Sequence, residues 1–156
     1  MPASILITQC LQNDFVRHVE RFDPIPNSLH VGHGESRRLL GDRPQEGPIA
    51  RAIEWAYRQP DDRLRLIHIR DWHDPSDPVQ ERHLSQFGVH CIAGTKGAGF
   101  AFAVPEGHGK DVPIIDATVL NDFQGTNLSA TLAPLATEPR RVVLVGVLTE
   151  AKITFL

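Results

Sequence analysis

Four short apolar runs, separated by segments of a different character, set the architecture that this 156-residue sequence can adopt. The runs cover residues 4–8, 64–70, 112–119 and 141–147, and the last of them (RVVLVGV) is the richest in β-branched residues. Short apolar runs without a helical period are typical of buried strands. Strands that alternate with helices predict a parallel sheet covered on both faces. We therefore expect a three-layer α/β/α domain with a central, mainly parallel sheet.

The clearest helical pattern begins at Pro48. Apolar residues recur there at positions 49, 52, 53, 56 and 57, which predicts an amphipathic helix that ends near Pro60. Shorter helices are expected at residues 35–40 and, interrupted by Pro134, at residues 128–135. Residues 71–99 are dense in His, Asp, Pro and Gly and have little periodicity, so we expect a long loop there. Loops of this length in a compact domain are usually functional.

Composition excludes several classes of protein. A length of 156 residues with 41% hydrophobic and 22% charged residues indicates one globular domain over residues 1–156. A net charge of −3 gives no general attraction to nucleic acid or to anionic lipid, and no apolar stretch approaches the roughly 20 residues of a membrane span. The two cysteines, Cys10 and Cys91, have no paired spacing, so we expect no disulfide scaffold and a cytoplasmic location.

The sequence stops soon after its last apolar run, in what resembles the first turns of an apolar helix. Burial of Ile153, Phe155 and Leu156 would need more protein than the sequence provides. We therefore expect a chain that is truncated at its C-terminus or is the N-terminal part of a longer polypeptide. A native gene product of 17.3 kDa would contradict this expectation.

A cluster of carboxylate and imidazole residues follows the second apolar run. Asp71 and His73 are alternate residues of an extended segment, so their side chains should point the same way. His90 can complete a set of three ligands, and His83 is either a fourth ligand or a neighbour. Such ligands suit zinc, iron(II) or manganese(II), and open positions are typical of catalytic or ligand-binding sites. The alternative is chance clustering of solvated histidines, because the chain has eight.

Several segments together resemble the isochorismatase-like hydrolase superfamily, and within it the nicotinamidases. They keep their order and approximate spacing over nearly the whole chain: an apolar strand at residues 5–7 with Q-N-D-F at 12–15, D-W-H at 71–73, an H-x-S-F-like element at 83–87, H-C at 90–91, G-T-x-G at 94–97, F-x-G-T-x-L at 123–128 and G-V-x-T at 146–149. The resemblance implies an isochorismatase-like fold and a metal that positions the ring nitrogen of a substrate. It also implies a small-molecule ligand and a tendency to form homo-oligomers or to pair with other domains; the ligand contacts would be Phe15, Trp72, Leu148 and Thr149.

The departures from the family concern its catalytic triad. In the family an Asp acts as the base, a Lys supports the thiolate and a Cys attacks the carbonyl carbon. The matching positions hold Cys10, Ala117 and Lys152 in this chain. A lysine ammonium cannot replace a thiolate unless burial strongly lowers its pKa. The resemblance therefore implies a pseudoenzyme that retains a metal and small-ligand site and serves a binding or regulatory role.

Other interpretations stay open at this point. If Cys10 and Lys152 face each other, the ammonium could lower the thiol pKa and create a cysteine-dependent hydrolase of a small amide such as nicotinamide. A metal-bound water could serve the same reaction. A purely structural interaction domain is a third possibility. The glycine-rich residues 94–99 lack the full phosphate-loop pattern and follow no apolar strand, so we expect no nucleotide cofactor.

Overall fold

The computed structural model describes residues 4–107, 109–136, 140–148 and 152. Its sheet has four parallel strands in the order β3-β2-β1-β4: β1 (Ser4–Gln9), β2 (Leu64–Asp71), β3 (Ile114–Ala117) and β4 (Arg141–Gly146). The helices are α1 (Asn13–Val16), α2 (Gly32–Leu40), α3 (Pro48–Arg58), α4 (Glu81–Phe87) and α5 (Leu128–Leu132), and a 3-10 turn, Ala133–Leu135, follows α5. The predicted α/β fold with a parallel sheet is confirmed.

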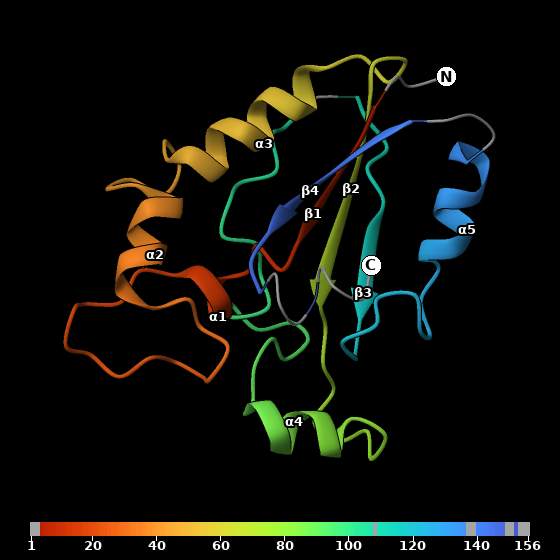
Figure 1. Cartoon of the computed structure of the whole chain (residues 1–156). Helices are drawn as coiled ribbons and strands as arrows, with labels where there is room; N and C mark the ends of the chain where they lie inside the picture. The colour runs from red at the N-terminus through yellow and green to blue at the C-terminus, as the bar shows by residue number, and fades with distance from the viewer. Residues whose placement is uncertain (1–3, 108, 137–139, 149–151, 153–156) are drawn as a thin grey trace.

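Two apolar layers cover the two faces of the sheet, because successive strand residues point to opposite faces. Leu6, Leu64 and Leu66 pack with α3 on one face. Ile7, Ile67 and Ile115 pack on the other face, toward α5 and the turn after it. Figure 1 shows α3 and α5 on opposite sides of the strands. The expected three-layer arrangement is therefore present.

The predicted helix boundaries agree with the structure where the apolar periodicity extends over several helical turns. The helix that begins at Pro48 ends at Arg58, and its buried residues are Ile49, Ile53, Ala56 and Tyr57. The loop expected at residues 71–99 contains α4, which sequence reasoning missed. Only His83 and Leu84 of this seven-residue helix are buried, so it has too few apolar residues to show a period. The strand expected at residues 112–119 is only four residues long, because only Ile114–Ala117 pairs with β2.

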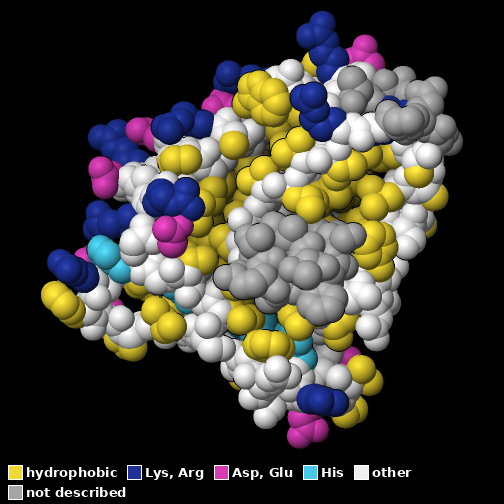
Figure 2. Space-filling model, in the orientation of Figure 1, with side chains coloured by type: hydrophobic (Ala, Val, Ile, Leu, Met, Phe, Trp, Pro, Cys, Tyr) yellow, Lys and Arg dark blue, Asp and Glu magenta, His cyan; other side chains and the backbone are white. Residues whose placement is uncertain are grey.

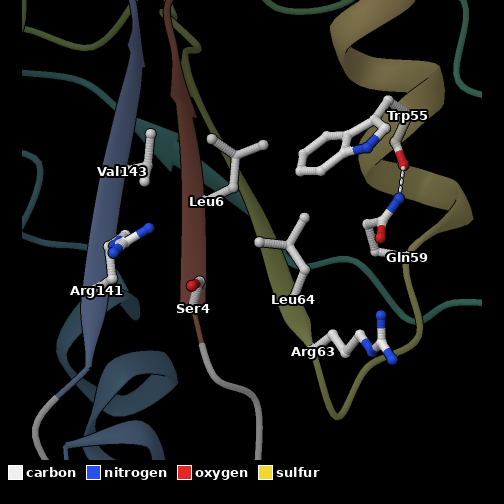
Figure 3. Close-up of a pocket in the computed structure, with 8 residues that line it drawn as sticks. All are labelled: Ser4, Leu6, Trp55, Gln59, Arg63, Leu64, Arg141 and Val143. Carbon is white, nitrogen blue, oxygen red and sulfur yellow. Dashed lines mark hydrogen bonds between the residues drawn. The ribbon is translucent and has the colours of Figure 1, made fainter.

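The edge of the sheet at β4 exposes apolar side chains. Val142, Val143 and Val145 are all exposed there. A trough of about 310 Å³ runs beside β4, with the side chains of Trp55, Leu6 and Leu64 around the same space (Figure 3). Apolar side chains also gather between α3 and β4 in the space-filling view (Figure 2). In the part of the chain that the structure describes, no helix has both the length and the hydropathy to cross a membrane.

Candidate metal centre

The site forms where β1 and β2 end, at the carboxyl edge of the parallel sheet. Gln12 joins these two strand ends through its side-chain amide. Its Oε1 accepts a hydrogen bond from the backbone N–H of Asp71 at 2.7 Å, and its Nε2 donates to the carbonyl oxygen of Asp71 at 2.7 Å. Nε2 also donates to the carbonyl oxygen of Ala98 at 2.9 Å. The backbone of Asp71 is therefore fixed on both sides by one buried glutamine.

The neighbouring Asp14 secures the segment that carries His90. Its Oδ2 accepts a hydrogen bond from the backbone N–H of Cys91 at 2.8 Å. Its own backbone N–H donates to the carbonyl oxygen of Gly97 at 3.0 Å, and a Cβ at Gly97 would clash with the Asp14 carboxylate. The residues of the Q-N-D-F element therefore hold the loop of the site in place, and the close approach explains why glycine stands at position 97.

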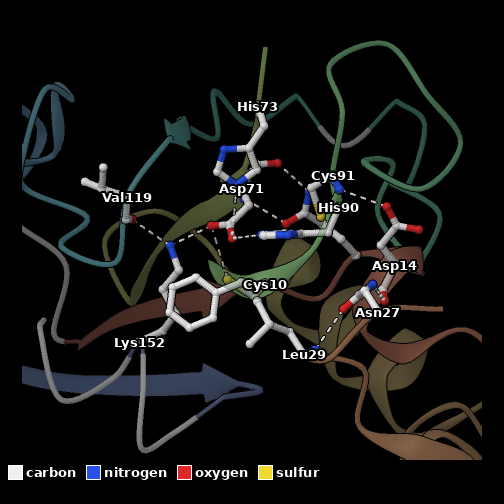
Figure 4. Close-up of polar contacts among 12 residues, drawn as sticks. Cys10, Asp14, Asn27, Leu29, Asp71, His73, His90, Cys91, Val119 and Lys152 are labelled. Atoms are coloured by element: carbon white, nitrogen blue, oxygen red, sulfur yellow. Dashed lines mark hydrogen bonds and ion pairs between the residues drawn. The ribbon is translucent and has the colours of Figure 1, made fainter. Parts of the chain in front are cut away.

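Four buried polar atoms converge on one point beside Asp71. They are Oδ2 of Asp71 and the Nε2 atoms of His73, His83 and His90, and each lacks a hydrogen-bond partner. Oδ2 lies 3.7 Å from Nε2 of His73 and 3.6 Å from Nε2 of His90. The ligand atoms that the four residues offer all lie within 4.8 Å of one another. Figure 4 shows Asp71, His73 and His90 turned toward one another.

The opposite ring nitrogens of two histidines are held by oxygen acceptors. Nδ1 of His73 lies 2.9 Å from Oε1 of Gln80, and Nδ1 of His90 lies 2.6 Å from the carbonyl oxygen of Gly88. Because these oxygens only accept, each Nδ1 carries a hydrogen, and in the neutral ring Nε2 then presents a lone pair. Metal-binding histidines in proteins have this arrangement. The orphaned atoms and the fixed tautomers together fit a divalent metal ion.

His83 completes the cluster from α4. Its ring stacks on that of His73 with centroids 5.0 Å apart, and burial lowers its pKa to about 4. A neutral imidazole is the form that binds a metal. The ring also borders an open surface hollow of about 510 Å³ between α4 and residues 119–124, whose lining includes Arg82, Phe87 and Asn121. His83 therefore stands between the cluster and a space large enough for a small molecule.

The three positions predicted to correspond to the family triad lie near this cluster. Cys10 is fully buried, and its Sγ lies 3.8 Å from Oδ1 of Asp71. Burial and the Asp71 carboxylate raise the pKa of the Cys10 thiol, and Lys152 lowers it by less. Lys152 lowers this pKa, as the sequence suggested, but burial and Asp71 outweigh it and the net shift is upward. Ala117 is buried and apolar.

Lys152 makes the shortest ion pair of the site. Its Nζ lies 2.6 Å from Oδ1 of Asp71 and 3.2 Å from Oδ1 of Asp122. Burial is the largest single effect and favours the neutral amine, but Asp71, Cys10 and Asp122 together outweigh it and raise the pKa of Lys152 above its usual value. Burial likewise opposes the charge on Asp71, while Lys152, His73 and His90 hold the pKa of that carboxyl well below its usual range. Both groups are therefore charged at neutral pH.

Asp122 and Gln9 are part of the site, although sequence reasoning did not identify them. Asp122 is fully buried, accepts hydrogen bonds from Lys152 and from Nε2 of Gln9, and has its pKa raised to about 6 by burial. Gln9 and Asp122 are 113 residues apart in the sequence, so no local sequence pattern links them. The only available signal was the position of Asp122 directly before the F-x-G-T-x-L element.

The residues expected to contact a ligand lie at different places. Phe15 is fully buried, with its ring 5.5 Å from that of His90. Trp72 packs under the guanidinium of Arg70, 3.7 Å from the ring centre. Leu148 has a left-handed backbone, with φ of 62°, and lines a separate pocket with residues such as His30 and Arg38. Thr149 lies outside the described residues. Ligand contact by these residues stays a prediction.

Comparison with known proteins bears on the fold. No family model and no curated protein sequence matches this chain. A pyrazinamidase/nicotinamidase from Streptococcus mutans superposes with a TM-score of 0.68 at 25% identity, over 96% of this chain and 75% of its own. An isochorismatase-like hydrolase from Alkaliphilus metalliredigens has a TM-score of 0.66 at 22% identity, over 97% and 71%. The chain has the isochorismatase-like hydrolase fold. The pyrazinamidase of Pyrococcus horikoshii in complex with zinc has a TM-score of 0.62 at 25% identity, over 99% of this chain and 76% of its own.

Proposed function

We propose that this isochorismatase-like domain binds a divalent metal ion and a small ligand, and that it serves a binding or regulatory role rather than thiol-dependent hydrolysis. The convergence of four buried, unpartnered ligand atoms on one point carries the proposal. Leaving such atoms without a partner is costly in a protein interior, and a metal ion would satisfy all four. Asp71, His73 and His90 would hold the ion, with His83 as a fourth ligand.

A bound ion would supply a Lewis-acidic position for a ring nitrogen or carbonyl oxygen of the ligand. The resemblance to a zinc-bound pyrazinamidase and to nicotinamidases makes a small cyclic amide such as nicotinamide the first ligand to test. The open hollow beside His83 offers apolar, amide and guanidinium groups to such a molecule. Its volume of about 510 Å³ is in the range of small-molecule sites.

The triad positions support a role without covalent catalysis. A reactive thiol needs a low pKa, whereas burial raises the pKa of Cys10. Lys152 is protonated and committed to two carboxylates, so it is no nucleophile. Ala117 has no polar group that could assist either residue. We therefore propose that the Asp-Lys-Cys machinery of the family has been replaced in this chain.

The test measures binding and turnover in the same sample. Protein loaded with Zn²⁺, Mn²⁺ or Fe²⁺ is titrated with nicotinamide by calorimetry, and ammonia release is followed over hours, with Asp71→Asn as the control. We expect metal-dependent binding without ammonia above the blank. Ammonia release that disappears in Asp71→Asn would instead support a metal-dependent hydrolase. Release that disappears in Cys10→Ser but not in Asp71→Asn would support a thiol enzyme.

A further inference from the structure

Lys152 is buried to 1% exposure, and the structure places three acceptors around its ammonium group. Two of them, Oδ1 of Asp71 at 2.6 Å and the carbonyl oxygen of Val119 at 2.9 Å, are drawn in Figure 4. The third is Oδ1 of Asp122 at 3.2 Å. An ammonium group has three hydrogens to donate. All three are therefore engaged within the protein, and the group has no donor left for a ligand.

The carboxylate of Asp71 faces two different environments. Its Oδ1 pairs with Lys152, whereas its Oδ2 has no hydrogen-bond partner and faces Nε2 of His73 and of His90. One oxygen of the carboxylate is thus neutralised by a fixed cation of the protein. The other is directed at the candidate metal position.

We propose that Lys152 is the resident counter-ion of the candidate metal centre: it neutralises Asp71 in the metal-free protein and thereby weakens the binding of divalent cations. The inference rests on the proposed function. A buried carboxylate without a cation is strongly destabilising, so Lys152 allows the site to exist without a metal. A divalent ion at Oδ2 would share one carboxylate with the ammonium, and two cations at that separation repel each other.

The opposite effect is possible in principle, because Lys152 could favour metal binding by orienting Asp71. The backbone of Asp71, however, is already fixed by two 2.7 Å hydrogen bonds with Gln12. Lys152 therefore contributes less to the orientation of the Asp71 carboxylate than to the neutralisation of its charge. Charge repulsion decides the sign, and loss of the ammonium should strengthen metal binding.

The experiment compares zinc affinity in the full chain by competition with a chromophoric chelator. The neutral variants are Lys152→Met and Lys152→Gln, and the matched control is Lys96→Met, which removes an exposed ammonium. We expect both neutral variants to bind zinc at least about tenfold more tightly than the wild-type protein, because the repulsion between the two cations is lost. The Lys96→Met variant should keep the wild-type affinity.

Thermal unfolding with and without zinc provides the second measurement. The neutral variants leave Asp71 and Asp122 without Lys152, so their metal-free forms should be less stable and should gain more from zinc than the wild-type protein gains. Equal or weaker zinc binding by the neutral variants would overturn the inference, as would variants that remain unfolded in excess zinc. Absence of zinc binding in every protein, including the wild type, would instead remove the proposed function itself.

Discussion

The ring of His73 is locked by Gln80, whose Oε1 lies 2.9 Å from Nδ1 of the imidazole. Gln80 is itself fixed, because its Nε2 donates to Oδ2 of Asp77 at 2.9 Å. This chain of contacts keeps Nε2 of His73 free and directed at Asp71. The glutamine at the start of α4 therefore orients a candidate metal ligand without touching the metal position.

Replacement of Gln80 tests this positioning role. We expect Gln80→Ala to weaken zinc binding by about 10- to 100-fold, since the ring of His73 loses its orientation and its preferred tautomer. Gln86→Ala, an exposed glutamine on α4, is the control and should bind as the wild type does. The measurement is a zinc competition titration of both variants. Equal affinities for Gln80→Ala and Gln86→Ala would show that the contact has no part in metal binding.

The role of His83 decides whether the candidate metal site has three or four protein ligands. We expect His83→Ala to retain one zinc ion per chain but to bind it at least about tenfold more weakly, because one imidazole ligand is lost. His33→Ala in α2 serves as the control for the loss of a histidine. Zinc affinity that does not change in His83→Ala would make His83 a neighbour of the site rather than a ligand.

The two cysteines should resist alkylation in the folded protein. Both are buried, and burial raises the pKa of each thiol, so little thiolate is present at neutral pH. Mass spectrometry after iodoacetamide treatment should find Cys10 and Cys91 unmodified under conditions that label both in urea. Labelling of folded Cys10 at the rate of a free model thiol would contradict the account of this position.

Stability should fall in acid because of His68, which lies in β2 between Thr8 and Tyr57. Its Nδ1 is 2.6 Å from Oγ1 of Thr8, its Nε2 is 3.0 Å from the Tyr57 hydroxyl, and burial lowers its pKa from 6.5 to about 4. The unfolded chain therefore binds a proton below about pH 6.5 that the folded chain accepts only near pH 4. Stability is full above pH 6.5 and declines toward pH 4.

The effect can be isolated with His68→Gln. Because the folded chain binds this proton more weakly than the unfolded chain, His68 should lower the free energy of unfolding by about 2 kcal/mol between pH 7 and pH 5. The free energy of unfolding is measured in urea at pH 7 and at pH 5. Its decrease between these pH values should be smaller by this amount in His68→Gln than in the wild type. An unchanged difference would mean that His68 takes up its proton equally in both states.

The sequence predicted the strands well where a short apolar run defines them. The strand expected at residues 4–8 is β1, Ser4–Gln9, and the run at 141–147 is β4, Arg141–Gly146. The alternation of Asp71 and His73 also predicted that their ligand atoms would meet. These features depend on neighbouring residues and on the period of the backbone. They could therefore be inferred from local pattern.

Features that depend on distant contacts were not predictable. Gln80 orients His73 from the position just before α4, a helix with no apolar period, and Asp122 contacts Lys152 across 30 residues. The net direction of the Cys10 pKa could not be decided from the sequence, because it depends on burial and on Asp71, 61 residues away, as well as on Lys152. The identity of a polar residue does not indicate which distant residue it will contact, so these contacts can be identified only in the folded chain.

The most direct test of the account is the metal content of the purified chain, measured by elemental analysis after dialysis against zinc and then against buffer. We predict about one zinc ion per chain in the wild-type protein, held by the ligand set of Asp71, His73 and His90. In Asp71→Asn, which keeps the size of the side chain but removes its charge, that zinc should be absent. Wild-type protein that retains no zinc, or an Asp71→Asn variant that retains it fully, would contradict the candidate metal centre.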